Sequence, residues 1–214
     1  MIDFNVRLKT ISLLCIGWSH PSIFGPDIPF IRELNSNGKM RIYIPASSFR
    51  GALRSSAIKL AENYGFKSCG EIRPELIEDR HNRMGGKCDV CDLFGEPMNI
   101  SSLIVSNFEP IKDIKSLILT RIRLEDNSLK VSEEALFKVE YIPVGSEFLG
   151  NIKLINPTQK RAALLLIALA GLRIGRFGRG SNPIDIRIEN TEKIEALLGD
   201  WYDLLNELKG WLWH

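Results

Sequence analysis

Residues 156–188 have the sequence NPTQKRAALLLIALAGLRIGRFGRGSNPIDIRI, which predicts a helix, a glycine-rich loop and a strand in direct succession. Asn156 and Pro157 supply a cap and a first-turn proline, so we expect the apolar residues behind them to form a helix that ends near Leu172. Apolar and polar residues then alternate over residues 183–188, which is the two-residue period of a strand. The stretch therefore predicts an apolar helix that leads into a closing strand.

Strand and helix patterns precede this stretch, and a further helix pattern follows it. Strand-like apolar patterns occupy residues 4–18, 103–108, 117–124, 137–141 and 148–155. An apolar stripe at helical spacing covers residues 48–64, where Ser47 or Ser48 can cap the helix, and a broader stripe covers residues 191–213. The order strand, helix, strands, helix, strand predicts an α+β fold of the ferredoxin-like (RRM-like) βαββαβ type with an added amphipathic carboxy-terminal helix.

Three segments interrupt this order without ending the domain. Residues 20–37 contain too many prolines and glycines for a regular element, and they predict a long loop. Residues 65–100 form a cysteine-containing insertion, and residues 115–142, with a polar turn at 125–127, predict a protruding β-hairpin. We therefore expect residues 1–214 to be one domain with two insertions.

Four potential metal ligands lie within the first insertion. They are Cys69, His81, Cys88 and Cys91, spaced C-x11-H-x6-C-x2-C. Three thiolates and an imidazole complete the tetrahedral shell of a structural Zn²⁺, which leaves no position for a catalytic water. The alternative is a set of unrelated thiols in a cytosolic protein. Disulfides are disfavoured, because Cys15 lies in an apolar strand pattern and nothing indicates export.

Composition and charge set broad limits on the class of protein. The 214 residues carry a net charge of +2, which excludes a wholesale polycation and leaves local basic patches open. The longest apolar run, residues 162–172, is about half as long as a bilayer crossing needs. No secretory signal is evident at the amino terminus, so we expect a cytoplasmic protein without a membrane partner.

The glycine-rich loop at residues 171–180 points to a ligand. It holds four glycines and three arginines, Arg173, Arg176 and Arg179, with no acidic residue among them. Glycines allow a close approach of the backbone and arginine forks bind phosphates, so the loop predicts a grip on a phosphate backbone. It lacks the Gly-Lys-Ser/Thr of a P-loop. A flexible basic turn is the alternative, and Phe177 is either a base-stacking residue or a core anchor.

Four stretches occur in order along the chain: IPASSFRGALR at 44–54, CDVCDLFG at 88–95, YIPVGSEF at 141–148 and the glycine-rich loop. They resemble patterns of the RAMP superfamily of CRISPR proteins, namely Ile-Pro-Gly-Ser-Ser-Leu-Lys-Gly-x-x-Arg, a Cys-x-x-Cys-x-Leu-Phe-Gly metal turn, Val-Pro-x-Gly-Ser-Glu-Phe and a glycine-rich signature loop. The resemblance is strongest to the repeating backbone subunit of type III (Csm-type) RNA-targeting effector complexes.

This resemblance implies a subunit that polymerises with other copies of itself along a guide RNA and contacts other subunits of the effector complex. The body of the domain would form an RNA-binding palm, and the hairpin would form a thumb that wedges between bases. The residues that the resemblance assigns to the guide RNA are Ser47, Ser48, Arg50 and Arg54 at the helix start and Arg173, Arg176 and Arg179 in the loop. A helix start suits this role, since its free amides and the positive end of its dipole face the phosphates.

The resemblance also implies a catalytic aspartate in the loop after the first strand. Cleaving members have a Gly-x-x-Asp-x-Pro pattern, and the sequence GPDIP at residues 25–29 is similar but one residue shorter. Asp27 would bind Mg²⁺ or Mn²⁺ and help the 2′-hydroxyl of the target RNA to attack its own phosphodiester, which leaves a cyclic phosphate and a free 5′-hydroxyl. His20 is a rival general base, although a surface or RNA-binding role is favoured for it.

Two functions remain open at this point. The chain is either an endoribonuclease subunit that cleaves target RNA through Asp27 or a catalytically silent scaffold paralogue that binds guide RNA and neighbouring subunits. A stand-alone processing nuclease is disfavoured, because the sequence lacks a clear histidine acid–base pair. Trp201, Trp211 and Trp213 fit a contact with an adjacent subunit and a place in the core equally well.

Overall fold

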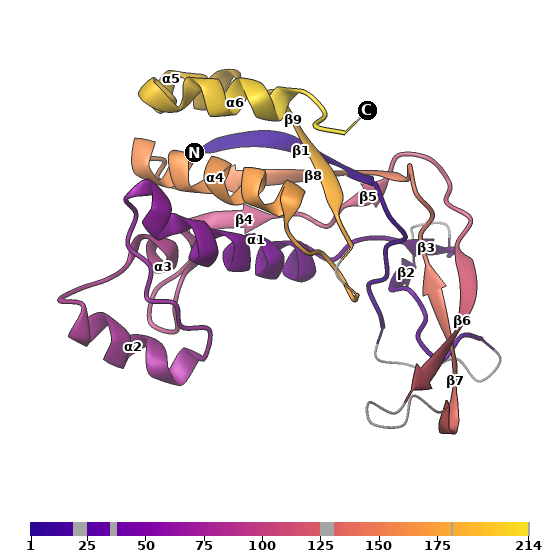
Figure 1. Ribbon diagram of the computed structural model, residues 1–214. Helices are drawn as coiled ribbons and strands as arrows, with labels where there is room; N and C mark the ends of the chain where they lie inside the picture. The colour runs from indigo at the N-terminus through magenta and orange to yellow at the C-terminus, as the bar shows by residue number, and fades with distance from the viewer. Residues whose placement is uncertain (19–24, 35–37, 125–130, 181, 214) are drawn as a thin grey trace.

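The computed structural model describes residues 1–18, 25–34, 38–124, 131–180 and 182–213, and Figure 1 shows the arrangement of their elements. The mixed α and β fold that the sequence predicts is confirmed, and the named strands pair antiparallel. The main sheet has the order β4 (Leu103–Val105), β8 (Glu147–Leu154), β1 (Ile2–Thr10) and β9 (Ile184–Glu189), and β5 (Glu109–Pro110) also pairs with β8.

Alternation along β1 separates the two faces of this sheet. Every second residue from Ile2 to Thr10 is buried, and the residues between them are partly exposed. The helices α1 (Ala46–Leu60) and α4 (Gln159–Ile174) lie side by side against the sheet (Figure 1). Most of α4 is buried, because it packs against α1, β9 and the carboxy-terminal helices, and this explains its nearly uninterrupted apolar run. Among the described residues, no helix has the length and apolar character to cross a bilayer.

Two crossing connections gather several loops at one end of the sheet. α1 joins β1 to β4 on either side of β8, and α4 joins β8 to β9 on either side of β1. The register pairs Thr10 with Ile184 and Lys9 with Glu147. The loop after β1, the glycine-rich loop before β9 and the hairpin before β8 therefore all leave the sheet at this end.

The hairpin consists of β6 (Leu117–Leu124) and β7 (Val131–Tyr141), and it projects beyond the main sheet (Figure 1). Leu117 lies opposite Tyr141 at its base. The turn that the sequence predicts at residues 125–127 lies outside the described part of the chain.

The first strand and the long loop differ from the sequence prediction. β1 ends at Thr10 rather than near residue 18, because the chain then pairs elsewhere, with bridges from Leu14 to Ile142 and from Gly17 to Phe30. Within the predicted loop, β2 (Arg32–Leu34) pairs with β3 (Met40–Ile42). The loop prediction is therefore wrong for these three residues, which form a strand because they pair with Met40–Ile42.

The cysteine-containing insertion contains two helices. A short 3₁₀ turn, η1 (Ala61–Tyr64), extends α1 and ends at Gly65, whose φ is 77°. Two helices follow, α2 (Pro74–Arg83) and α3 (Asp89–Phe94), and α3 packs against both α1 and α4. The insertion is thereby attached to the helical layer of the domain.

The start of α4 also differs from the prediction. The side chain of Thr158 caps the helix and accepts a hydrogen bond from the Arg161 N–H at 3.2 Å. Asn156 lies before the helix with a φ of 46°, which asparagine tolerates better than most residues. The predicted cap is therefore two residues early, because Asn156 turns the chain out of β8 instead.

The carboxy-terminal segment is three pieces rather than one helix. It comprises α5 (Glu192–Leu198), η2 (Gly199–Trp201) and α6 (Tyr202–Lys209). Gly199 breaks it with a φ of 50°, and the Gln159 side-chain amide donates to the Leu198 carbonyl at 3.2 Å where α5 ends. The pieces pack along α4, β1 and β9 (Figure 1).

The tryptophans make contacts within the chain. The Trp201 ring lies 5.9 Å from the Phe66 ring, and Trp211 lies beneath the cationic groups of Lys9 and Arg187 at 5.6 and 5.1 Å. Trp213 is 48% exposed. Trp201 and Trp211 thus contact other parts of the same chain, whereas the exposed ring of Trp213 stays available for a contact with a neighbouring subunit.

Candidate metal centre and nucleic-acid interface

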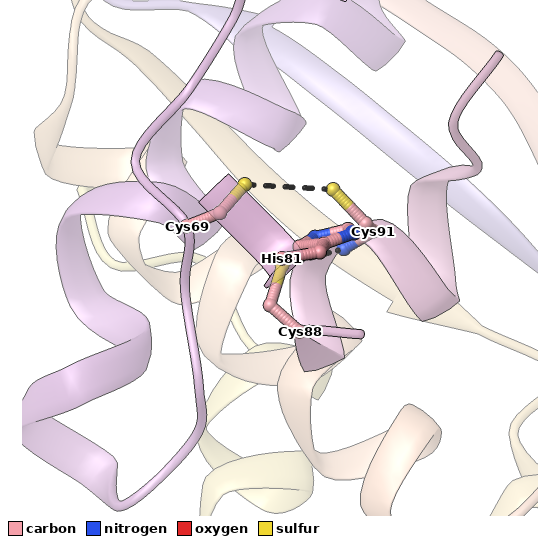
Figure 2. Close-up of side chains that lie close together, drawn as sticks. All are labelled: Cys69, His81, Cys88 and Cys91. Carbon is pink, nitrogen blue, oxygen red and sulfur yellow. Dashed lines mark hydrogen bonds between the residues drawn. The ribbon is translucent and has the colours of Figure 1, made fainter. Parts of the chain in front are cut away.

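The cysteine–histidine cluster brings together all four predicted ligands (Figure 2). Their potential ligand atoms lie within 4.8 Å of one another. Cys69 precedes α2, His81 lies in its last turn, and Cys88 and Cys91 bracket the first turn of α3. The Sγ atoms of Cys69 and Cys91 are 3.7 Å apart, close to the separation of roughly 3.8 Å that two sulfurs on one tetrahedral zinc require.

His81 carries the clearest sign that the cluster fits a metal ion. Its Nδ1 lies 2.9 Å from Oε2 of Glu96, which orients the ring and favours a proton on Nδ1. Among the described residues, its Nε2 is buried without a hydrogen-bond partner. An unprotonated Nε2 beside three sulfurs is the fourth donor that a tetrahedral ion needs (Figure 2).

The sulfurs also interact with one another electrostatically. Interactions with the Cys91 side chain and with the Cys91 backbone N–H, which donates to the Cys88 sulfur at 3.3 Å, outweigh burial and lower the pKa of Cys88 to about 4. The neighbouring Cys88 sulfur, burial and the charges of Cys88 and Cys69 raise the pKa of Cys91. Three adjacent thiolates are therefore unfavourable by themselves, and a divalent cation would remove this repulsion. The donor set fits a structural Zn²⁺, which would cross-link α2 and α3.

The region around the cluster is joined firmly to the rest of the fold. The Arg161 guanidinium of α4 binds Asp92 of α3 with two hydrogen bonds of 2.6 and 2.9 Å. Gly95 ends α3 with a φ of 83°, and a Cβ there would lie 2.9 Å from the Ser101 backbone nitrogen. A side chain at position 95 would therefore clash with the backbone, which explains the glycine. The pairing of Arg161 with Asp92 holds α3 against α4.

The start of α1 forms one side of a second candidate site. Pro45 is the N-cap residue, so the prediction that Ser47 or Ser48 caps the helix is wrong. The Ala46 N–H instead donates to the Asn107 side chain at 2.9 Å. Ser47 is exposed and Ser48 is half-buried in the first turn, where backbone amides have no partner within the helix.

The glycine-rich loop forms the other side of this site. Phe177 is buried and its ring lies 6.3 Å from that of Phe49 in α1, so it is a core anchor rather than a base-stacking residue. Gly178 has a φ of 70°, and a Cβ there would lie 2.6 Å from the Cys15 carbonyl oxygen. The Arg179 N–H donates to the same oxygen at 2.7 Å. The backbone of the loop is held in place beside the start of α1 (Figure 1).

Two of the predicted loop arginines are exposed. The side chains of Arg176 and Arg179 extend from this anchored backbone into solvent. Arg176 also lines a groove with Ser55 and Lys59 of α1. Ser55 and Lys59 belong to the carboxyl-terminal half of α1, so this positive groove runs along that half of the helix, whereas Phe177 of the same loop packs near Phe49 at the helix start.

The loop that contains Asp27 lies next to the base of the hairpin. Asp27 is exposed, and its Oδ2 accepts a hydrogen bond from the Lys138 backbone N–H at 2.7 Å. Ile28 pairs with β7, and the Trp18 N–H donates to the Pro29 carbonyl at 2.9 Å. Because the segment before Trp18 also holds the glycine-rich loop through Cys15, the two loops are connected by continuous backbone contacts.

The family model of the RAMP superfamily matches residues 7–182. The chain belongs to the RAMP superfamily. Its members are CRISPR-associated proteins that bind RNA and act in complexes, so this RAMP protein has a CRISPR-associated RNA-binding role. Among the curated proteins, none matches the chain significantly.

The side chain of Arg173 in this RAMP protein is buried and does not lie on the RNA-binding surface that the resemblance assigns to it. It is 4% exposed, and its guanidinium donates to the carbonyls of Ile186, Glu207 and Gly210. It also lies 3.2 Å from the buried carboxylate of Asp185. Because α4 continues past the predicted loop start, Arg173 points into the core and joins β9 to α6. A phosphate cannot reach it.

Arg50 and Arg54 also have partners within the chain. Both face the carboxyl end of α3, where Arg50 donates to the Phe94 carbonyl and Arg54 to the Gly95 carbonyl at 3.2 Å. Cations at this end of a helix are favourable, because they compensate the unpaired carbonyls. Their guanidinium groups thus bind the cysteine-containing insertion rather than extend from the exposed start of α1. His20 lies outside the described residues.

Three residues of the candidate sites were missed by sequence reasoning. Glu96 orients His81, Asn107 completes the start of α1, and Glu140 binds the loop after Asp27 through the Phe30 N–H at 2.8 Å. Glu96 directly follows the Cys-x-x-Cys-x-Leu-Phe-Gly turn, so an acid next to that motif was an available signal. Asn107 and Glu140 carry no such signal, because their partners are distant in sequence.

Proposed function

We propose that this RAMP protein is a guide-RNA-binding backbone subunit of a type III (Csm-type) CRISPR effector complex. The main sheet with α1 and α4 then serves as a ferredoxin-like palm, and β6 and β7 serve as the thumb. The observation that carries the proposal is the exposed pair Arg176 and Arg179 on an anchored glycine-rich loop beside the start of α1. Guide and target RNA and further copies of the subunit are its proposed partners.

The proposed RNA contact combines three physical features. The guanidinium groups of Arg176 and Arg179 bind phosphate oxygens as planar forks. The first-turn amides of α1 and the hydroxyls of Ser47 and Ser48 add neutral donors at the positive end of the helix dipole. Because none of these contacts involves a base edge, this surface would bind the guide without regard to its sequence.

We further propose that Asp27 supports cleavage of the target RNA. The Lys138 N–H orients one of its oxygens, and the carboxylate can then bind Mg²⁺ or Mn²⁺. The RNA 2′-oxygen forms a bond to the adjacent phosphorus and loses its proton to solvent, while the bond from phosphorus to the 5′-oxygen breaks and that oxygen gains a proton. The substrate has to be RNA, because DNA lacks the attacking hydroxyl.

The alternative is a silent scaffold paralogue that binds guide RNA without cleavage. The hydrogen bond from Lys138 to Asp27 favours it, since that contact gives the carboxylate a structural role. In this case Asp27 would fix its loop to β7, and the family pattern would be retained for that reason.

A pair of matched variants tests the RNA contact. Arg176→Gln combined with Arg179→Gln should weaken guide-RNA binding at moderate salt and reduce the salt dependence of log K by about 0.7 for each lost phosphate contact. Arg83→Gln changes an exposed arginine on α2 in the same way and should leave binding unchanged. Equal binding by all three proteins would contradict the proposed surface.

A second pair separates cleavage from scaffolding. Asp27→Asn retains an oxygen that can accept from the Lys138 N–H but removes the charge that binds a cation. In a reconstituted complex with complementary RNA and Mg²⁺, it should slow cleavage by about 10²-fold or more and retain RNA binding. Asp200→Asn, an exposed site in η2, is the control. Unchanged cleavage in Asp27→Asn, or no cleavage by the unaltered complex, would favour the scaffold.

A further inference from the structure

Arg54 contacts a sulfur of the cysteine–histidine cluster. One terminal nitrogen, Nη2, lies 3.4 Å from Sγ of Cys91, and Nη1 donates to the Gly95 carbonyl at 3.2 Å. The side chain is half-buried between α1 and α3. Its planar fork therefore binds the metal-binding turn at two points, one of which is a ligand atom.

Charge balance gives this contact a physical role. One Zn²⁺ with three thiolates and a neutral imidazole has a net charge of −1. Cys88 and Cys91 are buried, and a buried uncompensated charge is costly. The arginine stays protonated under all ordinary conditions, so Arg54 would bring the net charge of the group to zero.

We propose that Arg54 is an outer hydrogen-bond partner of the metal site, which orients the Cys91 sulfur, compensates the net charge of the zinc–thiolate group and thereby strengthens metal binding. Hydrogen bonds to the ligands of a metal orient them and tune their electron density. The proposal assigns to the metal site a residue that the family resemblance assigns to RNA. It also implies that α1, whose first turn carries Ser47 and Ser48, is tied directly to the metal-binding insertion.

Arg50 provides a matched control in the same helix. Its guanidinium donates to the Phe94 carbonyl, one residue before Gly95, and so attaches α1 to the same end of α3. Among the described residues, Arg50 makes no hydrogen bond to a sulfur. A loss of α3 attachment should thus affect both arginine variants, whereas a loss of the sulfur contact should affect only Arg54 variants.

The first measurement is the loss of zinc from the full-length protein. Metal content is determined after purification, and zinc release to an excess of chelator is then followed for the unaltered protein, Arg54→Met and Arg50→Met. Arg54→Met should lower the zinc affinity about tenfold, which is the lower end of the range for the loss of a hydrogen-bond partner of a metal ligand. Arg50→Met should release zinc at nearly the rate of the unaltered protein.

The second measurement is the spectrum of the Co²⁺-substituted protein. A hydrogen bond lowers the energy of the sulfur electrons, so its removal should move the sulfur-to-cobalt charge-transfer band to longer wavelength. We expect this shift in Arg54→Met, a smaller one in Arg54→Lys, which retains a positive charge, and none in Arg50→Met. A merely structural role for Arg54 would not move the band.

The outcomes separate this proposal from the RNA-binding one. Equal zinc release and an unshifted band in Arg54→Met would overturn it, as would an unaltered protein that binds neither zinc nor cobalt. Neither result bears on guide-RNA binding, which the variants at Arg176 and Arg179 test separately. If Arg54→Met does not fold, the band position in Arg54→Lys relative to Arg50→Met gives the same answer.

Discussion

Glu140 should be one of the most important single side chains for the stability of this protein. Its side chain is 4% exposed, and it accepts hydrogen bonds from the Phe30 N–H at 2.8 Å, the Arg32 guanidinium and the Ser116 hydroxyl. It thereby connects the loop after Asp27 to the base of β6 and β7. Replacement by glutamine retains the volume but removes the charge and turns one acceptor into a donor.

The cost of Glu140→Gln follows from these contacts. Removal of one partner from a largely buried ion pair costs about 3 kcal/mol, the lower end of the range for buried pairs, because the Arg32 side chain that is left without its partner is 25% exposed. For a chain of this size, each kcal/mol lowers the melting temperature by roughly 2–4 °C, so we expect a decrease on the order of 10 °C. Glu147→Gln is the matched control, since Glu147 pairs with Arg7 at 3.3 Å with a side chain that is 35% exposed. It should cost less than about 1 kcal/mol.

The effect of Glu140→Gln should also depend on pH. Burial raises the pKa of Glu140, but the hydrogen bonds from Arg32, Ser116 and Phe30 outweigh it, so the folded-state pKa lies below the ordinary value of 4.5. The stability that the carboxylate contributes is therefore complete above pH 4.5 and disappears as the pH falls through the folded-state pKa.

Denaturant unfolding, followed by tryptophan fluorescence between pH 7 and pH 3.5, tests both expectations. The difference between the unaltered protein and Glu140→Gln should shrink toward the acidic end. A difference no larger than that of Glu147→Gln at neutral pH, or one that stays constant on acidification, would refute the reasoning.

Three further predictions concern glycines and the metal site. Gly178→Ala should destabilise the protein by about 1–3 kcal/mol in denaturant unfolding, because the added Cβ would clash with the Cys15 carbonyl oxygen and the backbone φ is 70°. Gly180→Ala is the control, since Gly180 has a similar φ of 90° but open space at its Cβ. An equal loss of stability in both variants would mean that the clash with Cys15 is unimportant. Glu96→Ala should weaken Zn²⁺ binding about 10–100-fold in a chelator competition, since His81 loses the group that orients it, and an unchanged affinity would contradict the assigned orientation. Gly51 is exposed in α1 with open space at its Cβ, so Gly51→Ala should stabilise the isolated protein by about 0.5–1 kcal/mol; destabilisation would show a contact that the fold does not explain.

Much of the fold was predictable because it depends on local periodicity. The bounds of β6 were predicted to the residue, and β8 and β9 to within one residue, since strand patterns repeat every second position. The carboxy-terminal helix was not, because its break at Gly199 depends on a hydrogen bond from Gln159 in α4. The cap of α1 likewise depends on Asn107, which is 61 residues away in sequence.

The amino-acid sequence by itself determined the four candidate metal ligands, the buried helix α4 and the membership of an RNA-binding family, because these depend on residue type and short spacing. Only the folded chain decided what five arginines contact, namely Arg50, Arg54, Arg173, Arg176 and Arg179. An arginine side chain is long enough to reach a carbonyl, a sulfur or solvent, and only the packing of α1, α3, β9 and α6 brings one of these within its reach. For this reason three of the five arginines bind the protein itself and two face outward.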